Sequence, residues 1–486
     1  MKLFGFGTKK QQALKATARS SKLRFYDAVD SELVQEIKSL FVDDIDINEI
    51  ISTHWRTITG RARKQYNNND YLRHFVSLAC VNVVGYNGIQ VQCQSQNKEL
   101  NNHTESLFKL WCESCDVTDR LSFIDVQILA IKSMVRDGEF ILIKHIDDEY
   151  QLRLQLIDPS RLDPSHNIEL SNGRKIVNGI EVNRLGKPLA YHFRKANSSE
   201  TVRISAEYVI HGFVPEYIGQ NRGISWFITS MIRSHLLKEY ETAAVDHAKT
   251  GAKVIGTFRS SEEYAQPDDQ APDIKQFEGS GMFELPPGYQ FDGFDPAYPT
   301  GEYALFKTSI LQAISGSLGY GVSYVSLAND LKGVSYSSAR QGALAERDAW
   351  RMVQQHLISQ LIRPIYRAWL EVEWLSSRLN CSDSDYQALK LASYQPRSWG
   401  WVDPVKEVKA MEMLLRNFLK SRKQIISENG LDIEKIDEEI KAEMMKFDEF
   451  KNISPEYITY LIGTFKSIVQ TTQSDDLEQQ EDEINE

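Results

Sequence analysis

The sequence is poor in cysteine and has no long apolar run. Its 486 residues include five cysteines, and a small, odd number of thiols is typical of a reducing compartment. No apolar run reaches the length of about 18 residues that a membrane-spanning helix needs. The opening MKLFGFGTKKQQALK has no apolar core of a signal peptide. These absences argue against a disulfide-stapled secreted protein and against a membrane partner.

The sequence also lacks the short motifs of common enzymes. It contains no GxxxxGK[ST], no GxGxxG after a strand, no HExxH and no GxSxG. Cys112 and Cys115 form a lone CxxC without a second pair or histidines at zinc-site spacing, so we expect two free thiols in a helix. We therefore expect no catalytic residue, no metal and no cofactor.

Two features that resemble acid–base sites have simpler explanations. Asp158 and Asp163 lie in LIDPSRLDP, where Asp-Pro commonly starts a turn. His211 ends a strand-like run, RISAEYVIHGF, and is expected to be structural. A nuclease or an ATPase remains an alternative, but it would need a metal cluster or phosphate loop that the sequence does not show.

The charge balance limits how the protein can meet nucleic acid. Its formal net charge is -11, whereas proteins that grip DNA by neutralising phosphates usually carry a basic face. Tight wrapping of DNA is therefore not expected. Passage of DNA close to the protein is compatible with this charge.

The first half of the chain predicts an α+β domain. Helical spacing of apolar residues in YLRHFVSLACVNVVG is followed by the turn YNG and the strand GIQVQCQ. Two helical stretches occupy residues 101–137. The strands EFILIKHI and QLRLQLI follow, and then a hairpin in NGIEVNRLGKPLAYHFRK with Gly186 and Pro188 in its turn.

The middle of the chain predicts two long helices around a β-rich insert. The helix at 224–252 has no proline, and Ile228, Ile232 and Leu236 recur at i, i+4. Residues 253–299 are rich in Gly, Pro and Asp and contain short strands, KVIGTF, GMFEL and YQFDGF. A second helix follows at 300–321. If the two helices pair antiparallel, they carry the insert outward as a stalk.

The stretch LKGVSYSSARQGALAERDAW predicts a capped helix preceded by a polar loop. Ser338 and Gln341 have capping-box spacing, and apolar residues continue with a helical period to Ile365. Pro364 removes a backbone donor, so we expect a kink or restart near it. The loop before the helix, with Asn329, Asp330, Lys332 and Gly333, is typical of a flexible projection.

The ends of the chain are expected to be less compact. Residues 1–59 begin as a basic, polar arm and continue into a helix. Residues 373–470 are strongly helical. The tail at 471–486, SDDLEQQEDEINE, is acidic and is expected to be disordered.

Several of these stretches, taken in order, resemble the lambda-type portal proteins of tailed bacteriophages. They run from about residue 24 to about residue 447. The quoted pieces are RARKQYNNNDYLRHFVSLACVNVVGYNGIQVQ, DGEFILIKH, LIDPSRLDP, NGIEVNRLGKPLAYHF, HGFVPEYIGQNRGISW, GVSYSSARQGALAE and WVDPVKEVKA. Each piece is weak alone, but their common order is specific.

The resemblance implies a multi-domain α+β portal fold. Its parts would be an α/β wing, a two-helix stem, a small β-rich clip, a long tunnel helix with a preceding loop, and a helical crown. The implied ranges are wing 60–223, stem 224–252 and 300–321, clip 253–299, tunnel loop 322–336, tunnel helix 337–372, and C-terminal wing and crown 373–470.

The resemblance also implies candidate site residues. Those for the DNA channel lie in the tunnel loop, those at the start of the tunnel helix follow it, and those for partner docking lie in the clip. In that order they are Asn329, Asp330, Lys332 and Ser335; Ser337, Ser338 and Arg340; and Arg259, Glu262, Glu263 and Asp268.

The implied function is a dodecameric ring of this chain at one capsid vertex. Double-stranded DNA would pass through it during packaging and ejection, and an acidic wall would repel the phosphates rather than hold them. The implied partners are the terminase large subunit, the head–tail adaptor, and the major capsid and scaffold proteins. The protein would be assembled in the host cytoplasm and end in the virion. The alternative is a non-portal ring or tail-adaptor protein without DNA passage.

Overall fold

The computed structural model describes most of the chain between residues 46 and 445. The described residues are 46–195, 200–253, 256–260, 289–293, 303–320, 322–330, 335–399, 404–428, 433, 436–442 and 445. The chain divides into two compact units, Met1–Tyr394 and Gln395–Glu486. The predicted basic arm, residues up to 45 of the predicted helix that follows it, and the predicted acidic tail lie outside the described residues.

Helices with side-chain caps open the first unit. The Asn69 side chain accepts the amide of Leu72 at 3.1 Å, and Ser122 and Asp125 form a reciprocal capping box. Such caps satisfy amides that a helix leaves unpaired, so each helix begins where the sequence supplies one. The helices are α1 (Ile47–Asn68), α2 (Asp70–Val83), α3 (Lys98–Glu113) and α4 (Phe123–Asp137).

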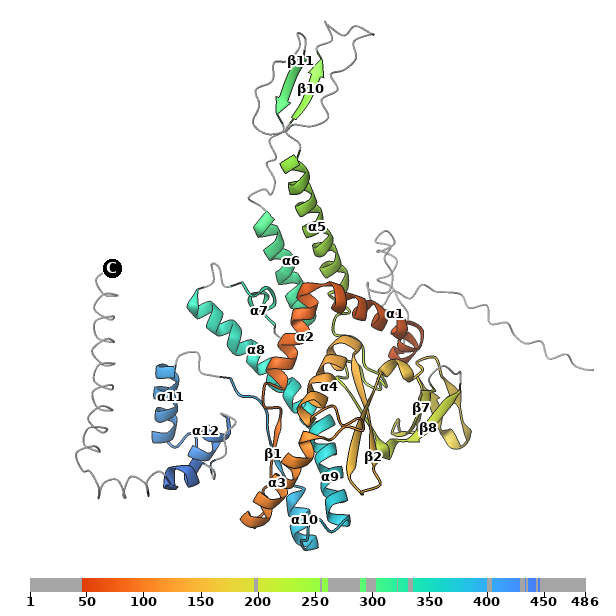
Figure 1. The fold of residues 1–486 in the computed structure, drawn as a ribbon, viewed down its shortest axis with the longest axis vertical. Helices are drawn as coiled ribbons and strands as arrows, with labels where there is room; N and C mark the ends of the chain where they lie inside the picture. Colours follow the sequence, from red (N-terminus) through yellow and green to blue (C-terminus); the bar gives the residue numbers. More distant parts are fainter. Residues whose placement is uncertain are drawn as a thin grey trace, which may run out of the picture. The chain divides into compact units, whose positions relative to one another are not determined.

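Two antiparallel sheets share one apolar core (Figure 1). One has the order β3-β2-β9, and the other is a meander from β4 to β8. Ile141 of the first sheet and Ile180 and Phe193 of the second belong to the same buried cluster. The strands of the two sheets are β2 (Glu139–Ile146), β3 (Leu152–Ile157), β4 (Ile168–Glu169), β5 (Lys175–Val177), β6 (Ile180–Val182), β7 (Pro188–Arg194), β8 (Thr201–Ser205) and β9 (Val209–Phe213). The strands predicted in EFILIKHI, QLRLQLI and NGIEVNRLGKPLAYHFRK are confirmed as β2, β3, β6 and β7. The run RISAEYVIHGF holds the end of β8 and the whole of β9, separated by a short 3-10 turn, and β4 and β5 were not predicted.

A pair of glycines lets two backbones touch where β2 begins. Gly138 ends α4 with φ of 95°, in the left-handed region. A side chain on Gly138 would overlap the backbone of Ile224, and one on Gly223 would overlap the backbone of Gly138. Only glycine fits both positions. The segment that leads into α5 therefore lies directly against the start of the sheet.

The two predicted long helices form an antiparallel pair, α5 (Met231–Lys253) and α6 (Tyr303–Leu318). Their direction follows from the contacts of Thr229 with Ser317 and of Glu241 with Lys307. The predicted helix is confirmed from Met231 onward.

The prediction of helix over 224–230 is wrong. This segment is a turn in which the Ser225 hydroxyl accepts the amide of Phe227 and the Ser230 hydroxyl donates to the Phe227 carbonyl. Serine side chains that bond nearby backbone compete with the helix in this way.

A hairpin of β10 (Gly256–Ser260) and β11 (Tyr289–Gly293) lies between these helices in the sequence. It confirms the strands predicted in KVIGTF and YQFDGF. The third predicted strand, GMFEL, lies outside the described residues.

The predicted polar loop at 322–336 contains a helix, α7 (Tyr324–Ala328). Ser323 caps it, and Leu327 within it is buried. The prediction of an irregular, flexible loop is therefore wrong for residues 323–330. The cause is local, because a serine cap and an apolar residue at the right spacing are enough to fold one helical turn against a core.

The long helix that follows is interrupted as predicted near Pro364. It consists of α8 (Tyr336–Leu357), a π-helical turn η6 (Ile358–Ile362) and α9 (Arg363–Leu375), with Pro364 in the first turn of α9. Proline has no amide to donate, and it stands just after the π turn, where the regular α-helical hydrogen-bond pattern is already interrupted. In the π turn, Gln360 accepts the amide of Phe213 at 2.9 Å and donates to the carbonyl of Phe213 at 3.1 Å.

The remaining described elements are short. In the first unit, α10 (Asp383–Leu389) follows α9, and β1 (Gln90–Gln92) pairs with β12 (Ser393–Gln395), within which the unit boundary falls. The second unit contains α11 (Pro404–Arg416) and α12 (Arg422–Glu428). These helices agree with the helical prediction for the C-terminal region.

Replacing Gly138 by alanine is expected to cost about 3 kcal/mol or more of unfolding free energy, because the new methyl group overlaps the Ile224 backbone. Denaturant unfolding measures this change. Gly186→Ala is the matched control: Gly186 also has a positive φ (81°), but a side chain there meets nothing within 4 Å. The control should cost only about 1 kcal/mol, and equal costs for the two variants would contradict the backbone contact.

Candidate functional site

The predicted channel residues flank the start of α8. Asn329 ends α7 in the left-handed conformation (φ 51°), and the amide of Asp330 donates to the carbonyl of Val325 at 3.1 Å. Both side chains are exposed. Ser338 and Arg340 lie in the first turns of α8. Lys332 and the Ser337 side chain lie outside the described residues.

The cap of α8 differs from the prediction. Ser335, not Ser338, is the N-cap, and its hydroxyl accepts the amide of Ser338 at 3.2 Å. The predicted capping box of Ser338 and Gln341 is therefore wrong. Both serines fit the general preference for hydroxyl residues at a helix start, and the helix begins one turn earlier than the spacing to Gln341 indicated.

Of the predicted clip residues, the structure describes Arg259 alone. It lies in β10, with Gln290 of β11 opposite. Glu262, Glu263 and Asp268 lie outside the described residues, so their role in partner docking stays a prediction.

Glu346 was missed by the sequence reasoning. It lies on α8, is 6% exposed, and accepts hydrogen bonds from the Ser326 hydroxyl at 2.7 Å and from the Trp350 indole at 3.3 Å. The signal was present in the sequence. Glu346 stands three residues after Ala343 and four before Trp350, so it is a charged residue on the apolar face of the helix.

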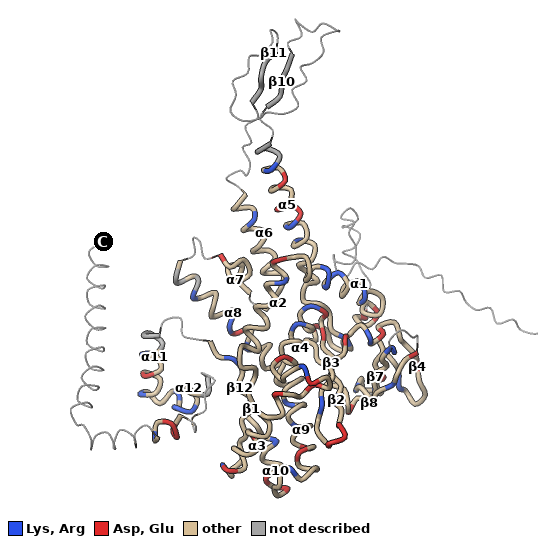
Figure 2. Tube along the Cα trace, in the orientation of Figure 1, with Lys and Arg blue, Asp and Glu red and all other residues tan. Residues whose placement is uncertain are grey.

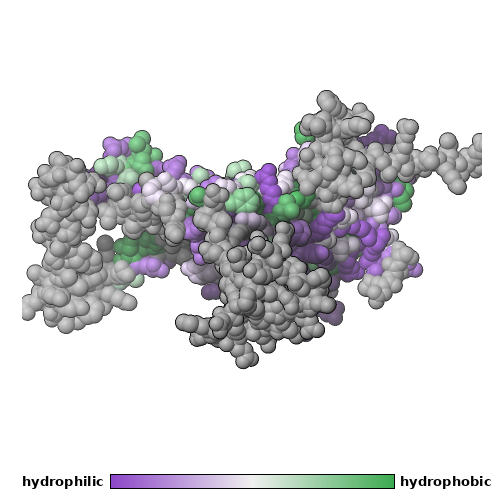
Figure 3. All heavy atoms as spheres, turned by 90° about the horizontal axis from the view of Figure 1, so that it is seen from above, coloured by the Kyte–Doolittle hydropathy of each residue, from purple (hydrophilic) through white to green (hydrophobic). Residues whose placement is uncertain are grey.

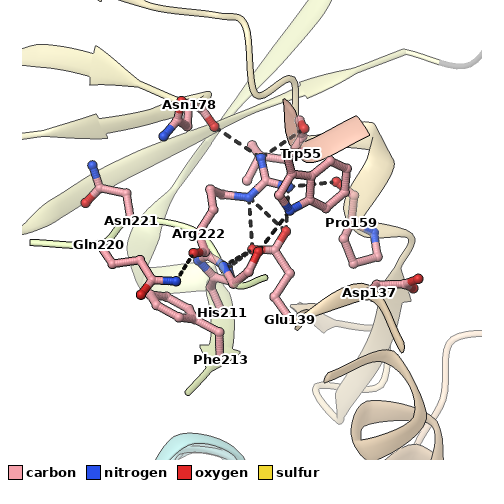
Figure 4. Close-up of polar contacts among 12 residues, drawn as sticks. Trp55, Asp137, Glu139, Pro159, Asn178, His211, Phe213, Gln220, Asn221 and Arg222 are labelled. Atoms are coloured by element: carbon pink, nitrogen blue, oxygen red, sulfur yellow. Dashed lines mark hydrogen bonds and ion pairs between the residues drawn. The ribbon is translucent and has the colours of Figure 1, made fainter. Parts of the chain in front are cut away.

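A buried arginine cluster joins the sheet to the segment that leads into α5 (Figure 4). Arg222 and Glu139 have fully buried side chains, and the Arg222 Nε lies 2.8 Å from Glu139 Oε1. The Gly223 amide and the His211 Nε2 lie 2.8 Å and 3.0 Å from Glu139 Oε2. We call Trp55, Glu139, His211, Arg222 and Gly223 the arginine cluster.

The remaining donors of Arg222 bind backbone carbonyls. Nη1 donates to Leu162 at 3.1 Å and to Asn178 at 3.2 Å, and Nη2 donates to Pro159 at 3.1 Å. The Trp55 ring lies 4.5 Å from the guanidinium carbon. When all the donors of a guanidinium group make hydrogen bonds and an aromatic ring lies beside it, these contacts offset much of the free energy lost by removing its charge from water.

The electrostatics of the cluster favour an ionised carboxylate. Burial alone would raise the pKa of Glu139, but the neighbouring Arg222 and His211 outweigh it and lower this pKa to about 2. Such a group is a fixed structural anion at neutral pH. The prediction that His211 is structural is consistent with this contact.

A second group of ion pairs lies on α1 and at the end of α4. Arg63 binds Asp137 through two bonds of 2.8 and 3.0 Å and also binds Asp158 at 2.7 Å. Burial opposes ionisation of Asp158, yet hydrogen bonds from Arg63 and Ser160 lower its pKa to about 2. Asp158 caps the short helix η2 (Pro159–Arg161), and the Asp163 carboxylate accepts the amide of Ser165. The prediction that these aspartates belong to turns is confirmed.

The base of the α5–α6 pair is fastened to α2. Glu241 Oε1 accepts from the Tyr71 hydroxyl and from the Lys307 ammonium group, each at 2.8 Å. The Asn69 amide group donates to the carbonyl of Ser234 at 3.0 Å. Three helices thus meet at one carboxylate, which fixes the direction in which the pair leaves the body.

The described residues contain no group of three or more His, Cys, Asp or Glu side chains arranged to hold a metal. Their five cysteines are free thiols; Cys112 lies in α3 and Cys115 just after it. No helix among the residues searched is both long and apolar enough to cross a bilayer. The charged groups described above are held by partners within the chain, which is typical of a structural role.

The chain resembles known proteins over most of its length. The model of the family "Phage portal protein, lambda family" matches residues 35–354. A probable portal protein of Halomonas phage phiHAP-1 is 30% identical over 429 residues, which cover 83% of this chain and 82% of that protein.

Solved structures of gene transfer agent (GTA) particles are also similar. A chain from the neck of the native particle, computed with C12 symmetry, is 13% identical with a TM-score of 0.46, covering 79% of this chain and 94% of that one. A chain from the neck of the empty particle, computed with C6 symmetry, gives 13% identity and a TM-score of 0.45, covering 78% and 94%.

Acid unfolding tests the arginine cluster. The pKa of Glu139 is lowered in the folded chain, so its contribution to stability is complete above about pH 4.5 and is lost as the pH falls toward 2. The loss amounts to about 3 kcal/mol. Denaturant unfolding at several pH values should show a shallower acid decline for the double variant Glu139→Met, Arg222→Met, whose stability at pH 7 is also lower because three carbonyls lose their donor.

The control for acid unfolding is Glu99→Gln, at an exposed acid in the first turn of α3. It should keep the full decline of the unaltered chain. A double variant with the same acid decline as the unaltered protein would show that Glu139 is not held ionised by Arg222.

Proposed function

Because this chain belongs to the lambda family of phage portal proteins, we propose that it forms a dodecameric ring at one capsid vertex, through which DNA passes during packaging and ejection. The observation that carries the proposal is the family match over residues 35–354. That range includes the body, both helices of the α5–α6 pair and most of α8. Portal proteins are structural components of the virion, and the described ion pairs suit such a role.

We assign the parts of the portal fold to the elements of this chain. Residues 60–223 are the wing, α5 and α6 are the stem, and the β10–β11 hairpin belongs to the clip at 253–299. Residues 322–336 precede the tunnel helix, and the helices after residue 373 belong to the wing and crown. The ring is assembled in the host cytoplasm with the scaffold and major capsid proteins.

Helix α6 supports contact between copies of the chain. Among its sixteen residues only Lys307 is charged, and that charge is paired with Glu241. Leu305 and Phe306 are nevertheless 72% and 49% exposed. Large apolar side chains exposed next to each other on a helix are stabilised when another surface covers them. In a ring, a neighbouring copy of the chain would cover these exposed apolar side chains. Figure 3 shows hydrophobic and hydrophilic groups mixed on the described surface.

The charge pattern suits a channel that does not hold DNA. Lys, Arg, Asp and Glu are interspersed along the described chain rather than gathered into one basic face (Figure 2). The net charge of the whole chain is -11. Phosphates passing such a wall release few counterions and bind weakly. Asp330, exposed at the end of α7, is the proposed repulsive contact, and Asn329, Lys332, Ser335, Ser337, Ser338 and Arg340 are its proposed neighbours along the DNA path.

The clip is the proposed docking site for the terminase large subunit and later for the head–tail adaptor. Arg259 in β10 and the acidic residues Glu262, Glu263 and Asp268 are the proposed contacts. A short stretch of sequence that carries both signs of charge suits two partners that bind in turn, because each partner selects its own complement.

Leu305→Glu is expected to shift the assembled ring toward smaller species. A charge placed on the exposed apolar side of α6 opposes burial against a neighbouring copy. Size-exclusion chromatography with light scattering and electron microscopy of the purified protein measure the change. Gln312→Glu adds the same charge at an exposed polar position of α6 and should leave rings intact. Rings of unchanged abundance for Leu305→Glu would remove α6 from the interface.

Asp330→Lys is expected to lower DNA packaging while rings still form. The variant turns a repulsive contact into an attractive one, so passing phosphates are retained. The yield of DNA-filled particles measures passage, and electron microscopy confirms the ring. Asp148→Lys is the matched control, because Asp148 is also exposed but lies in the turn between β2 and β3. A normal yield from Asp330→Lys would refute the role of Asp330 in the channel.

A further inference from the structure

A buried carboxylate on α8 binds the first turn of α7. Glu346 Oε2 lies 2.7 Å from the Ser326 hydroxyl and 3.4 Å from both the amide and the hydroxyl of Ser323. Ser323 is itself the cap of α7, and its hydroxyl accepts the amide of Ser326 at 3.1 Å. A single carboxylate oxygen is therefore the acceptor for several donors of the first turn of α7.

The other oxygen of Glu346 is fixed by the core. Oε1 accepts from the indole of Trp350, one turn along α8, at 3.3 Å. Trp350 is fully buried and its ring lies 6.3 Å from that of Phe75 on α2. The carboxylate is thus locked in orientation by a large aromatic side chain that cannot move without disturbing the core.

A second helix grips α7 from another direction. His74 Nε2, on α2, lies 3.2 Å from the carbonyl of Ser326. Leu327 is 1% exposed, and the last turn closes through the Val325 carbonyl, which receives the amides of Asn329 and Asp330. The contacts of α7 with α8 and α2 therefore help to set the position of the Asn329 and Asp330 backbone at its end.

We propose that Glu346 is a positioning residue that latches α7 to α8 and so fixes where Asn329 and Asp330 face passing DNA. This inference rests on the proposed function for its last step only. The latch itself is a claim about hydrogen bonds within the chain. Moving the first turn of α7 away from α8 breaks the hydrogen bonds of this carboxylate with Ser323 and Ser326.

Hydrogen exchange on assembled rings tests the latch. Hydrogen bonds to a charged acceptor are strong, so Glu346→Ala and Ser326→Ala should each speed exchange of the 323–330 amides about tenfold or more. Glu346→Gln keeps one oxygen that can accept from Ser326 and should give a smaller increase. Ser326→Ala removes a single hydroxyl, so it decides the matter if Glu346→Ala fails to assemble.

Glu373→Ala is the matched control, because Glu373 is also a buried acid on the same long helix. It accepts from Arg378, which in turn binds the carbonyls of Glu149 and Tyr150. Its loss should speed exchange near those residues and leave 323–330 unchanged. Equal exchange of 323–330 in the unaltered ring, in Glu346→Ala and in Ser326→Ala would overturn the latch, whatever the packaging yield.

Packaging separates the latch from the proposed function. Lower yields of DNA-filled particles for Glu346→Ala and Ser326→Ala, with faster exchange, support the whole inference. Faster exchange with a normal yield, while Asp330→Lys still lowers the yield, overturns the positioning role of Glu346. Normal yields for all three variants overturn the proposed channel contact and leave the exchange result as the test of the latch.

Discussion

The ion pair of Glu139 and Arg222 is the interaction on which the arrangement of the first unit depends. It binds the first residue of β2 to the segment that enters α5, and it brings in the Leu162, Asn178 and Pro159 carbonyls from three further places. The cost of burying two charges is offset because every donor of the guanidinium is used. The pair therefore fixes geometry more than it adds stability.

Three further buried or half-buried carboxylates also accept from more than one side chain. Asp137 receives Arg63 and Arg136, Glu241 receives Tyr71 and Lys307, and Glu346 receives the first turn of α7. Apolar packing alone does not select one direction for a helix, since it is not directional. Carboxylates that accept from two or three elements supply the direction. For a portal protein, repeated copies can close a ring only if each copy has the same angles.

The sequence was informative where the signal is local. Periodicity located β2, β3, β6, β7 and β9 and the cores of α2, α4, α5 and α8, and Pro364 marked the restart of the long helix. Caps were less certain, because Ser335 and Ser338 are chemically alike and the choice between them depends on where the preceding chain turns. The turn at 224–230 was missed because the Ser225 hydroxyl accepts a nearby backbone amide. The spacing of apolar residues does not reveal such a hydrogen bond.

Long-range polar contacts were not predictable from one sequence. Glu139 and Arg222 are 83 residues apart in the sequence, and no pattern in the residues around either one indicates that they pair. Glu346 could have been noticed as a charge on an apolar face, but its partners lie in a segment that composition alone presents as a loop. The candidate channel residues were predicted from the family resemblance. The structure shows in addition the contacts of α7, at whose end Asn329 and Asp330 lie.

The π turn at η6 has a mechanical consequence. Gln360 binds both polar groups of Phe213 at the outer edge of β9, as a neighbouring strand would, so the sheet edge is closed by a side chain of the long helix. The same long helix therefore contacts α7 through Glu346 and the edge of the sheet through Gln360. Because both contacts belong to one long helix, the positions of α7 and of the sheet edge are linked through it.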